Sequence, residues 1–280
     1  MNLVAYAMML WDKSIARKVL FQCLNRLVTR NTVQIRNIIC LGHRIMNGNV
    51  ASIIQHIAAA AIAKELTILY ERFERPLATP ITIVAQDPGY DIENDGVLLA
   101  GFPVPIRIVS DPHGILAIYE SSLVMSCYPN FPVKQIVADL AADLPADAGP
   151  AAVLWNNSEW DDEHGGVDCV TYSWNEAVYF GNPGSRRMVD MLEGYAMMMD
   201  GAELFPGALF RVEDEERRHD ELTYEEDIER LVRAANEPLV QDANEVLEEG
   251  IKMDSDPNDT TLRSRAFHWI KDMELWARLE

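Results

Sequence analysis

The sequence is poor in cysteine, and the four cysteines that it has are scattered. Cys23, Cys40, Cys127 and Cys169 form no CxxC pair, and each lies in or beside an apolar stretch. Buried reduced thiols usually occupy such stretches. The pattern argues against a disulfide framework, which belongs to oxidising compartments, and predicts a reducing location, the cytoplasm or the nucleus.

Long apolar runs are also missing. No stretch reaches the roughly 18 residues that a helix needs to span the hydrocarbon core of a bilayer. The sequence therefore predicts no transmembrane segment. A secretory signal is not expected either, because no positively charged residue precedes the first apolar residues.

No glycine-rich phosphate loop and no nucleophile elbow can be found, since GxGxxG and GxSxG are both absent. A phosphate cradle needs glycines so that backbone N–H groups can approach the ligand, and only Gly42 and Gly48 lie near the first predicted strand and helix. Arg44 is an alternative clamp for a phosphate or a carboxylate. A structural turn is the simpler interpretation, and a nucleotide-type cofactor is the other. The sequence identifies neither a cofactor nor a catalytic residue.

Acidic residues outnumber basic ones, but only after the first quarter of the chain. The formal net charge is −20. Residues 1–75 carry ten Lys or Arg and four Asp or Glu, whereas residues 76–280 carry fourteen basic and forty acidic side chains. An acidic surface repels phosphate backbones, which argues against nucleic acid as a partner. A small molecule or a protein partner remains possible.

The basic N-terminal stretch, residues 1–32, has the pattern of an amphipathic helix. Leu20, Leu24 and Leu27 recur at helical spacing, with Lys and Arg between them. Three interpretations stay open: a helix docked on the domain, an organelle-targeting segment, or a helix on a membrane surface. Docking is favoured, because a strand follows almost at once.

Short apolar runs alternate with helical segments from residue 35 onwards. Five runs are typical of buried strands: 35–41, 81–85, 104–109, 122–128 and 151–155. Buried strands that alternate with helices mark a parallel sheet covered on both faces. The predicted fold class is α/β, with a Rossmann-like, doubly wound and mostly parallel sheet, an N-terminal helix and an acidic helical C-terminal extension.

The same pattern divides the chain into three parts. These are the docked helix at 1–32, the Rossmann-like domain at 33–205, and the acidic helical extension at 206–280. Within the domain, residues 115–120 are interpreted as a short strand and residues 185–204 as a Met-rich helix.

Turns and polar residues follow the predicted strands, at the edge of the sheet where ligands gather in parallel α/β proteins. The residues predicted to bind a ligand there are Gly42, His43, Arg44, Asp87, Tyr90, Asp111, Tyr128 and Asn156. We expect them to converge around one cleft. The alternative is that each residue caps or turns its own element.

Individual residues illustrate that alternative. Asp87 has the position of a ribose-binding carboxylate, but it can equally cap a helix that begins with Pro88. Asp111 and His113 share a turn that needs no ligand. His56 lies among alanines and isoleucines, where a satisfied buried histidine is more common than a ligand-binding one.

No metal site is predicted. Cys40 and His43 form a CxxH, which supplies too few ligands for zinc. The acidic cluster at 159–164 contains carboxylates beside a histidine, as divalent-cation sites do. Consecutive acids in a loop point in different directions, however, so a solvated loop is the favoured interpretation.

Several motifs, taken in order, resemble the sensitivity-to-red-light-reduced-like (SRR-like) domain family in its fungal form. They are IICLG at 38–42, QHIAAA at 55–60, VAQDPGY at 84–90, LLAGF at 98–102, DPHG at 111–114, LV at 123–124 and PNFPVKQI at 129–136. Asn258-Asp259-Thr260 and His268-Trp269 are similar to the ending of fungal members. The resemblance covers about 120 residues well.

The resemblance implies a Rossmann-like fold and a regulatory role. Members of the family are linked to light signalling, circadian gene expression and the control of haem biosynthesis. The family supplies no established catalytic residue. This sequence has Gly42-His43-Arg44 where many members have a second glycine, which puts close approach of a phosphate in doubt.

Overall fold

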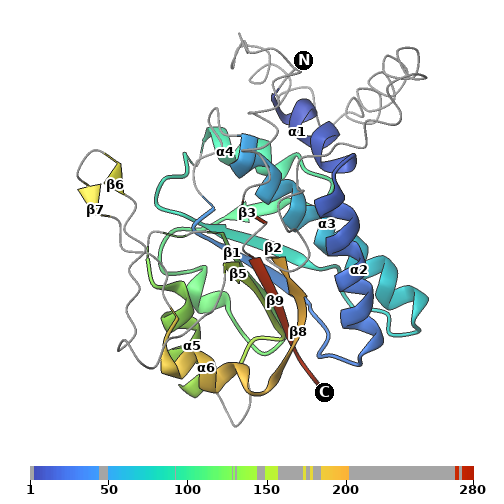
Figure 1. Ribbon diagram of the computed structural model, residues 1–280. Coiled ribbons are helices and arrows are strands. Elements are labelled where there is room, and N and C mark those ends of the chain that lie inside the picture. Colours follow the sequence, from blue (N-terminus) through green and yellow to red (C-terminus); the bar gives the residue numbers. More distant parts are fainter. Residues whose placement is uncertain are drawn as a thin grey trace.

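A seven-stranded sheet forms the centre of the molecule, with helices on both faces (Figure 1). The computed structural model describes residues 3–43, 50–91, 93–127, 129, 131–143, 149–156, 173–174, 177–178, 184–201, 269–270 and 273–280. The strand order in the large sheet is β3-β2-β1-β4-β5-β9-β8.

Five of the strands are parallel, and each overlaps one of the five predicted apolar runs. They are β1 (Asn37–Leu41), β2 (Thr82–Gln86), β3 (Ile106–Ile108), β4 (Ser122–Ser126) and β5 (Ala152–Asn156). All five residues of β1 are buried, as expected for the central strand of a covered sheet. The prediction of one mostly parallel sheet is confirmed.

The sheet continues with two antiparallel strands, β9 (Met273–Arg278) beside β5, and β8 (Tyr195–Asp200) at the edge. A separate two-stranded sheet consists of β6 (Ser173–Trp174) and β7 (Ala177–Val178).

The helices fall into two groups that cover opposite faces of the sheet (Figure 1). In chain order they are α1 (Leu3–Asp12), α2 (Ile15–Thr29), α3 (Val50–Arg72), α4 (Asn94–Ala100), the 3-10 helix η1 (Ile115–Ala117), α5 (Val133–Asp143) and α6 (Arg186–Leu192). Alternate residues of β1 belong to different cores. Ile38 and Cys40 pack with the apolar side chains of α1, α2 and α3, whereas Ile39 and Leu41 pack with those of α5 and α6.

The N-terminal stretch forms two helices rather than one. Ser14 separates them, and its Oγ accepts a hydrogen bond from the Arg17 backbone N–H at 3.0 Å, as an N-cap does. Leu20, Leu24 and Leu27 are fully buried, as their spacing predicts. Both helices contact α3.

Three local predictions are wrong. Residues 115–117 form η1 and not a strand. Helix α6 ends at Leu192, and the methionines after Gly194 lie in strand β8, because a glycine favours the end of a helix. Residues 273–278 belong to the sheet and not to a helical extension, since Met273, Leu275 and Ala277 are buried with the period of a strand. The rest of the predicted extension lies outside the described residues, apart from Trp269, Ile270, Leu279 and Glu280.

Helix α3 is long and apolar enough to cross a membrane by length and composition. Such a helix is also typical of a protein core, and 72% of the 18-residue apolar stretch of α3 is buried inside the structure. Ile54, Ala58, Ile62 and Leu66 are among its fully buried residues.

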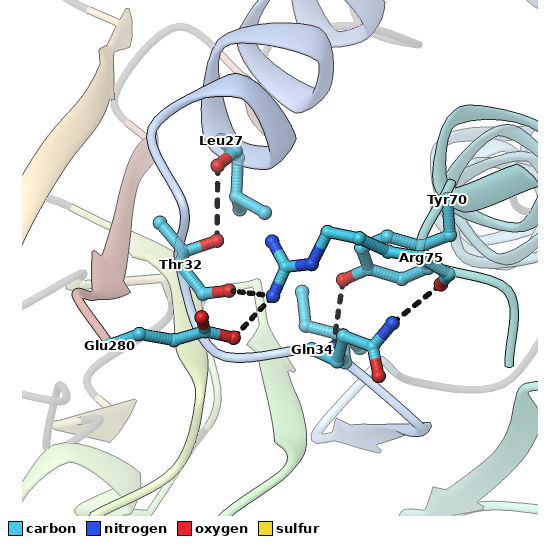
Figure 2. Close-up of polar contacts among 7 residues, drawn as sticks. Leu27, Thr32, Gln34, Tyr70, Arg75 and Glu280 are labelled. Carbon is cyan, nitrogen blue, oxygen red and sulfur yellow. Dashed lines mark hydrogen bonds and ion pairs between the residues drawn. The ribbon is translucent and has the colours of Figure 1, made fainter. Parts of the chain in front are cut away.

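Polar contacts tie the end of α3 and the residues just after it to the segment before β1 and to the C-terminal Glu280 (Figure 2). The Tyr70 hydroxyl accepts the Ile35 backbone N–H at 2.8 Å. One Arg75 nitrogen donates to the Thr32 carbonyl at 3.1 Å and pairs with the Glu280 carboxylate. The Gln34 side chain in turn donates to the Arg75 carbonyl at 2.6 Å. These contacts lie before β1 begins and therefore at the edge of the sheet opposite its carboxyl end.

We predict that Tyr70→Phe destabilises the protein by about 1–3 kcal/mol, because the buried Ile35 N–H loses its acceptor. Urea unfolding followed by circular dichroism measures the change. Tyr119→Phe is a matched control, since Tyr119 is 42% exposed, and it should change stability by less than about 0.5 kcal/mol. Equal stability of the two variants would show that the Tyr70 bond contributes nothing.

Candidate functional site

The residues that follow the parallel strands lie at one edge of the sheet, because the strands point the same way and are in close register. Leu41 pairs with Gln86, and Ser126 pairs with Trp155. The next positions, Gly42, Asp87, Cys127 and Asn156, therefore lie along this carboxyl edge. They share the sheet face that α3 covers, because side chains alternate along each strand.

A chain of buried polar contacts joins the loop after β1 to the loop after β2. The Ser52 hydroxyl donates to the His43 carbonyl at 2.7 Å. The His56 ring lies with Nε2 2.7 Å from the Tyr90 hydroxyl and Nδ1 2.7 Å from the Ser52 carbonyl. The rings of His43 and His56 meet edge to face, with their centroids 5.3 Å apart. His43 and His56 are fully buried, and Tyr90 is half-buried.

These contacts fix the tautomer of His56. A carbonyl oxygen can only accept, so Nδ1 must carry the proton that it donates to Ser52. In a neutral imidazole Nε2 is then an acceptor, and the Tyr90 hydroxyl must be its donor. Helix α3 thereby holds Tyr90 in place through His56.

Burial keeps both histidines uncharged. Burial lowers the pKa of His56 to about 4, although the Ser52 carbonyl and the Asp87 charge act in the opposite direction. The pKa of His43 is well below its usual value, because of burial and then because of His56. Burial also raises the pKa of Tyr90, as do the neighbouring Cys40 and Asp87. The side chains of His43, His56 and Tyr90 are therefore all uncharged at physiological pH.

Several buried polar atoms at the carboxyl edge have no hydrogen-bond partner. Both ring nitrogens of His43 are in this state, as are Ser126 Oγ at the end of β4 and Asn156 Oδ1 at the end of β5. The Met125 carbonyl raises the pKa of His43 slightly against the other effects, but it is not in hydrogen-bonding geometry with either nitrogen. A buried polar group without a partner costs about 1–3 kcal/mol, which makes these positions candidates for ligand contact.

Gly42 has a structural reason to be glycine. Its φ is +71°, a conformation that side chains disfavour. A Cβ atom at this position would lie 2.6 Å from the Cβ of Pro129. Its N–H donates to the Gln86 carbonyl at 3.1 Å. The space that a phosphate would use on this side is filled by the loop that follows β4.

A second group of contacts, centred on Gln86, organises the loop after β3. The Gln86 side chain donates to Asp111 Oδ1 at 2.8 Å and accepts the N–H groups of Gly114 at 2.6 Å and Ile115 at 3.3 Å. Gln86 is buried and Asp111 is exposed. Asp111 thus has an architectural partner, in agreement with the structural interpretation of its turn.

The predicted site residues are therefore brought together only in part. Gly42, His43, Asp87 and Tyr90 surround the His56 chain, and Asp111 belongs to the Gln86 group. Asn156 lies at the end of β5, two strands from β1. Arg44 and Tyr128 lie outside the described residues. That all eight residues share one cleft stays a prediction.

Asp87 shapes a turn and does not cap a helix, because the next helix, α4, begins only at Asn94, and its role in binding a ribose stays a prediction. Its Oδ1 accepts the Gly89 N–H at 2.8 Å, which shapes the turn after β2. Its charge also raises the pKa of His56, so the carboxylate lies within electrostatic reach of the buried chain.

Sequence reasoning missed the importance of Gln86 and Lys134. Lys134 is fully buried in the first turn of α5, and burial lowers its pKa to about 8, although the Glu274 carboxylate acts in the opposite direction. Glu274 accepts the Trp276 indole N–H at 2.9 Å. Lys134 belongs to the PNFPVKQI motif and lies two residues after Pro132, at the start of a predicted helix, but neither feature predicts its burial.

Metal ligands do not gather in the part of the chain that the structure describes, where no group of three or more His, Cys, Asp or Glu side chains is placed to hold an ion. The acidic cluster at 159–164 lies outside that part. Comparison with known proteins adds no assignment: no family model, curated protein or solved structure matches the chain. The resemblance to the SRR-like family stays a prediction that rests on the motifs.

We predict that Gly42→Ala destabilises the protein by about 1–2 kcal/mol or more, because of its positive φ and the contact with Pro129. Gly96→Ala is the control with the opposite sign. Gly96 lies in α4 with nothing within 4 Å of an added Cβ, so alanine should stabilise the protein by about 0.5–1 kcal/mol. Thermal denaturation of both variants measures the difference, and a stable Gly42→Ala protein would contradict the packing argument.

We predict that the protein loses stability as the pH falls from about 6.5 to about 4. In this range His56 takes up a proton when the chain unfolds but stays neutral when it is folded, so acid favours unfolding. The shift of its pKa corresponds to about 3 kcal/mol once the pH is below both values. His56→Gln should flatten the dependence in urea titrations, whereas His113→Asn, at an exposed position, should leave it unchanged. An unaltered dependence in His56→Gln would refute the assignment.

Proposed function

We propose that the protein binds a small polar ligand at the carboxyl edge of its sheet, between β1 and β4. The strand order supports this location. From β1 the chain proceeds to β2 and β3 on one side and then to β4 and β5 on the other. We propose that the fold is Rossmann-like on this basis. In such sheets, ligands bind where the order of the strands reverses, beyond the carboxyl ends.

The observation that carries the proposal is the state of His43. Its imidazole is fully buried at the end of β1, and neither ring nitrogen has a partner. Buried polar groups are almost always hydrogen-bonded, so a group left over at a strand end favours a bound molecule there. Ser126 Oγ at the end of β4 and Asn156 Oδ1 at the end of β5 likewise have no hydrogen-bond partner.

The motif resemblance suggests what binding is for. An SRR-like protein would act as a regulator, linked to light, circadian or haem-related signalling, and ligand binding would be its input. A protein partner is the other form of input. An enzyme that uses a nucleotide or adenosyl cofactor at this edge is the alternative. The packing of Gly42 against Pro129 weighs against it, because a cofactor phosphate needs that space.

We predict that native mass spectrometry of the purified protein detects a retained small molecule. His43→Phe should lose the retained mass while keeping the circular dichroism spectrum and a cooperative unfolding transition. His113→Asn, in an exposed turn at the same edge, should retain it.

Retention in His43→Phe would mean that the molecule binds elsewhere. The absence of any retained mass, together with no thermal stabilisation by a metabolite library, would contradict the proposed function.

A further inference from the structure

Among the described residues, the side chains placed against His43 carry no positive charge. His43 and His56 lie edge to face at 5.3 Å and are fully buried, so a proton on either ring would place a cation beside the other ring without water. No Lys or Arg occurs among the described loop residues 42–43, 87–91 and 109–114, and the buried Lys134 in the first turn of α5 has the Glu274 carboxylate within electrostatic reach. Asp87 and Asp111 add negative charge to this edge.

The glycine N–H groups of these loops, which allow the closest approach of an anion, are already used. Gly42 N–H bonds to the Gln86 carbonyl at 3.1 Å, Gly89 N–H to Asp87 Oδ1 at 2.8 Å, and Gly114 N–H to Gln86 Oε1 at 2.6 Å. An anion at a strand end is held by free N–H groups or by a cation. Among the described residues of these three loops there is no Lys or Arg, and no glycine N–H is free.

The ring of His43, whose nitrogens have no hydrogen-bond partner, indicates which ligand groups can bind beside it. A neutral imidazole has one N–H donor and one acceptor nitrogen. A ligand that carries both acceptors and donors can satisfy either position without bringing charge. A carboxylate supplies acceptors only, and no counterion for it occurs among the described loop residues at this edge, so its burial there is costly.

We infer that the part of the ligand that contacts His43 is uncharged and carries both hydrogen-bond donors and acceptors, as an amide or a heteroaromatic base does. The inference rests on the proposed function and narrows it to one chemical class. A phosphate or carboxylate is excluded from the position beside His43 and must, if the ligand has one, lie elsewhere.

Nicotinamide and nicotinate are a matched pair of probes, because they have the same ring and differ in charge at pH 7.5. Their binding is measured on the full chain by calorimetry and by the ring ¹⁵N resonances of labelled His43. Nicotinamide should bind at least about tenfold more tightly than nicotinate, and it should shift the His43 resonances. His43→Phe should lose this preference, and His113→Asn should keep it.

Equal or tighter binding of nicotinate at His43 would overturn the inference while leaving the proposed function intact. Loss of that nicotinate binding in Arg44→Ala would then identify a carboxylate or phosphate clamp instead. If neither probe shifts the His43 resonances, the inference is also wrong, and an ordered water is the simplest occupant. A His43-dependent retained mass in the native spectrum would still support ligand binding in that case.

Discussion

The hydrogen bond between the Tyr90 hydroxyl and His56 Nε2 connects the two loops on which the candidate site depends. His56 is held by the Ser52 carbonyl one turn earlier in α3, and the Ser52 hydroxyl holds the His43 carbonyl. One turn of α3 thus fixes the position of the loop after β1 and, through Tyr90, of the loop after β2. Because His43, Ser52 and His56 are buried, none of them can exchange its partner for water without a free-energy cost.

A second constraint closes the edge of the sheet from the side of β4. Pro129 occupies the space that Gly42 leaves by having no side chain. A glycine that follows a first strand is usually interpreted as room for a cofactor. Here the contact is between two loops of the protein, and the glycine is required by packing and by its φ of +71°. The same residue type at the same position therefore has a structural function.

The sequence predicts the parallel part of the sheet well because almost all residues of β1, β4 and β5 are buried, on both faces of the sheet. Runs such as 38–41 and 151–155 contain almost only apolar residues, which a strand in a covered sheet requires. Strands β8 and β9 were missed for the converse reason. Tyr195–Asp200 contains three methionines, which also suit a helix, and only the pairing with β9, 78 positions later, makes the segment a strand.

The candidate site is predicted only in part, because some of its contacts also depend on tertiary packing. Asp87 and Tyr90 can be read from one motif, but their relation to His56 depends on how α3 packs on the sheet.

The uncharged state of the site and its unfulfilled hydrogen bonds have one physical origin. Burial removes the charge from His43 and His56, and burial also makes the missing partners of His43 costly, at about 1–3 kcal/mol. A sequence selected for stability alone would avoid a buried ring at position 43 whose nitrogens have no partner. A polar ring at this position therefore lowers the stability of the empty protein. A ligand that satisfies the ring recovers that free energy in addition to its own contacts, so the cost of His43 becomes a contribution to binding.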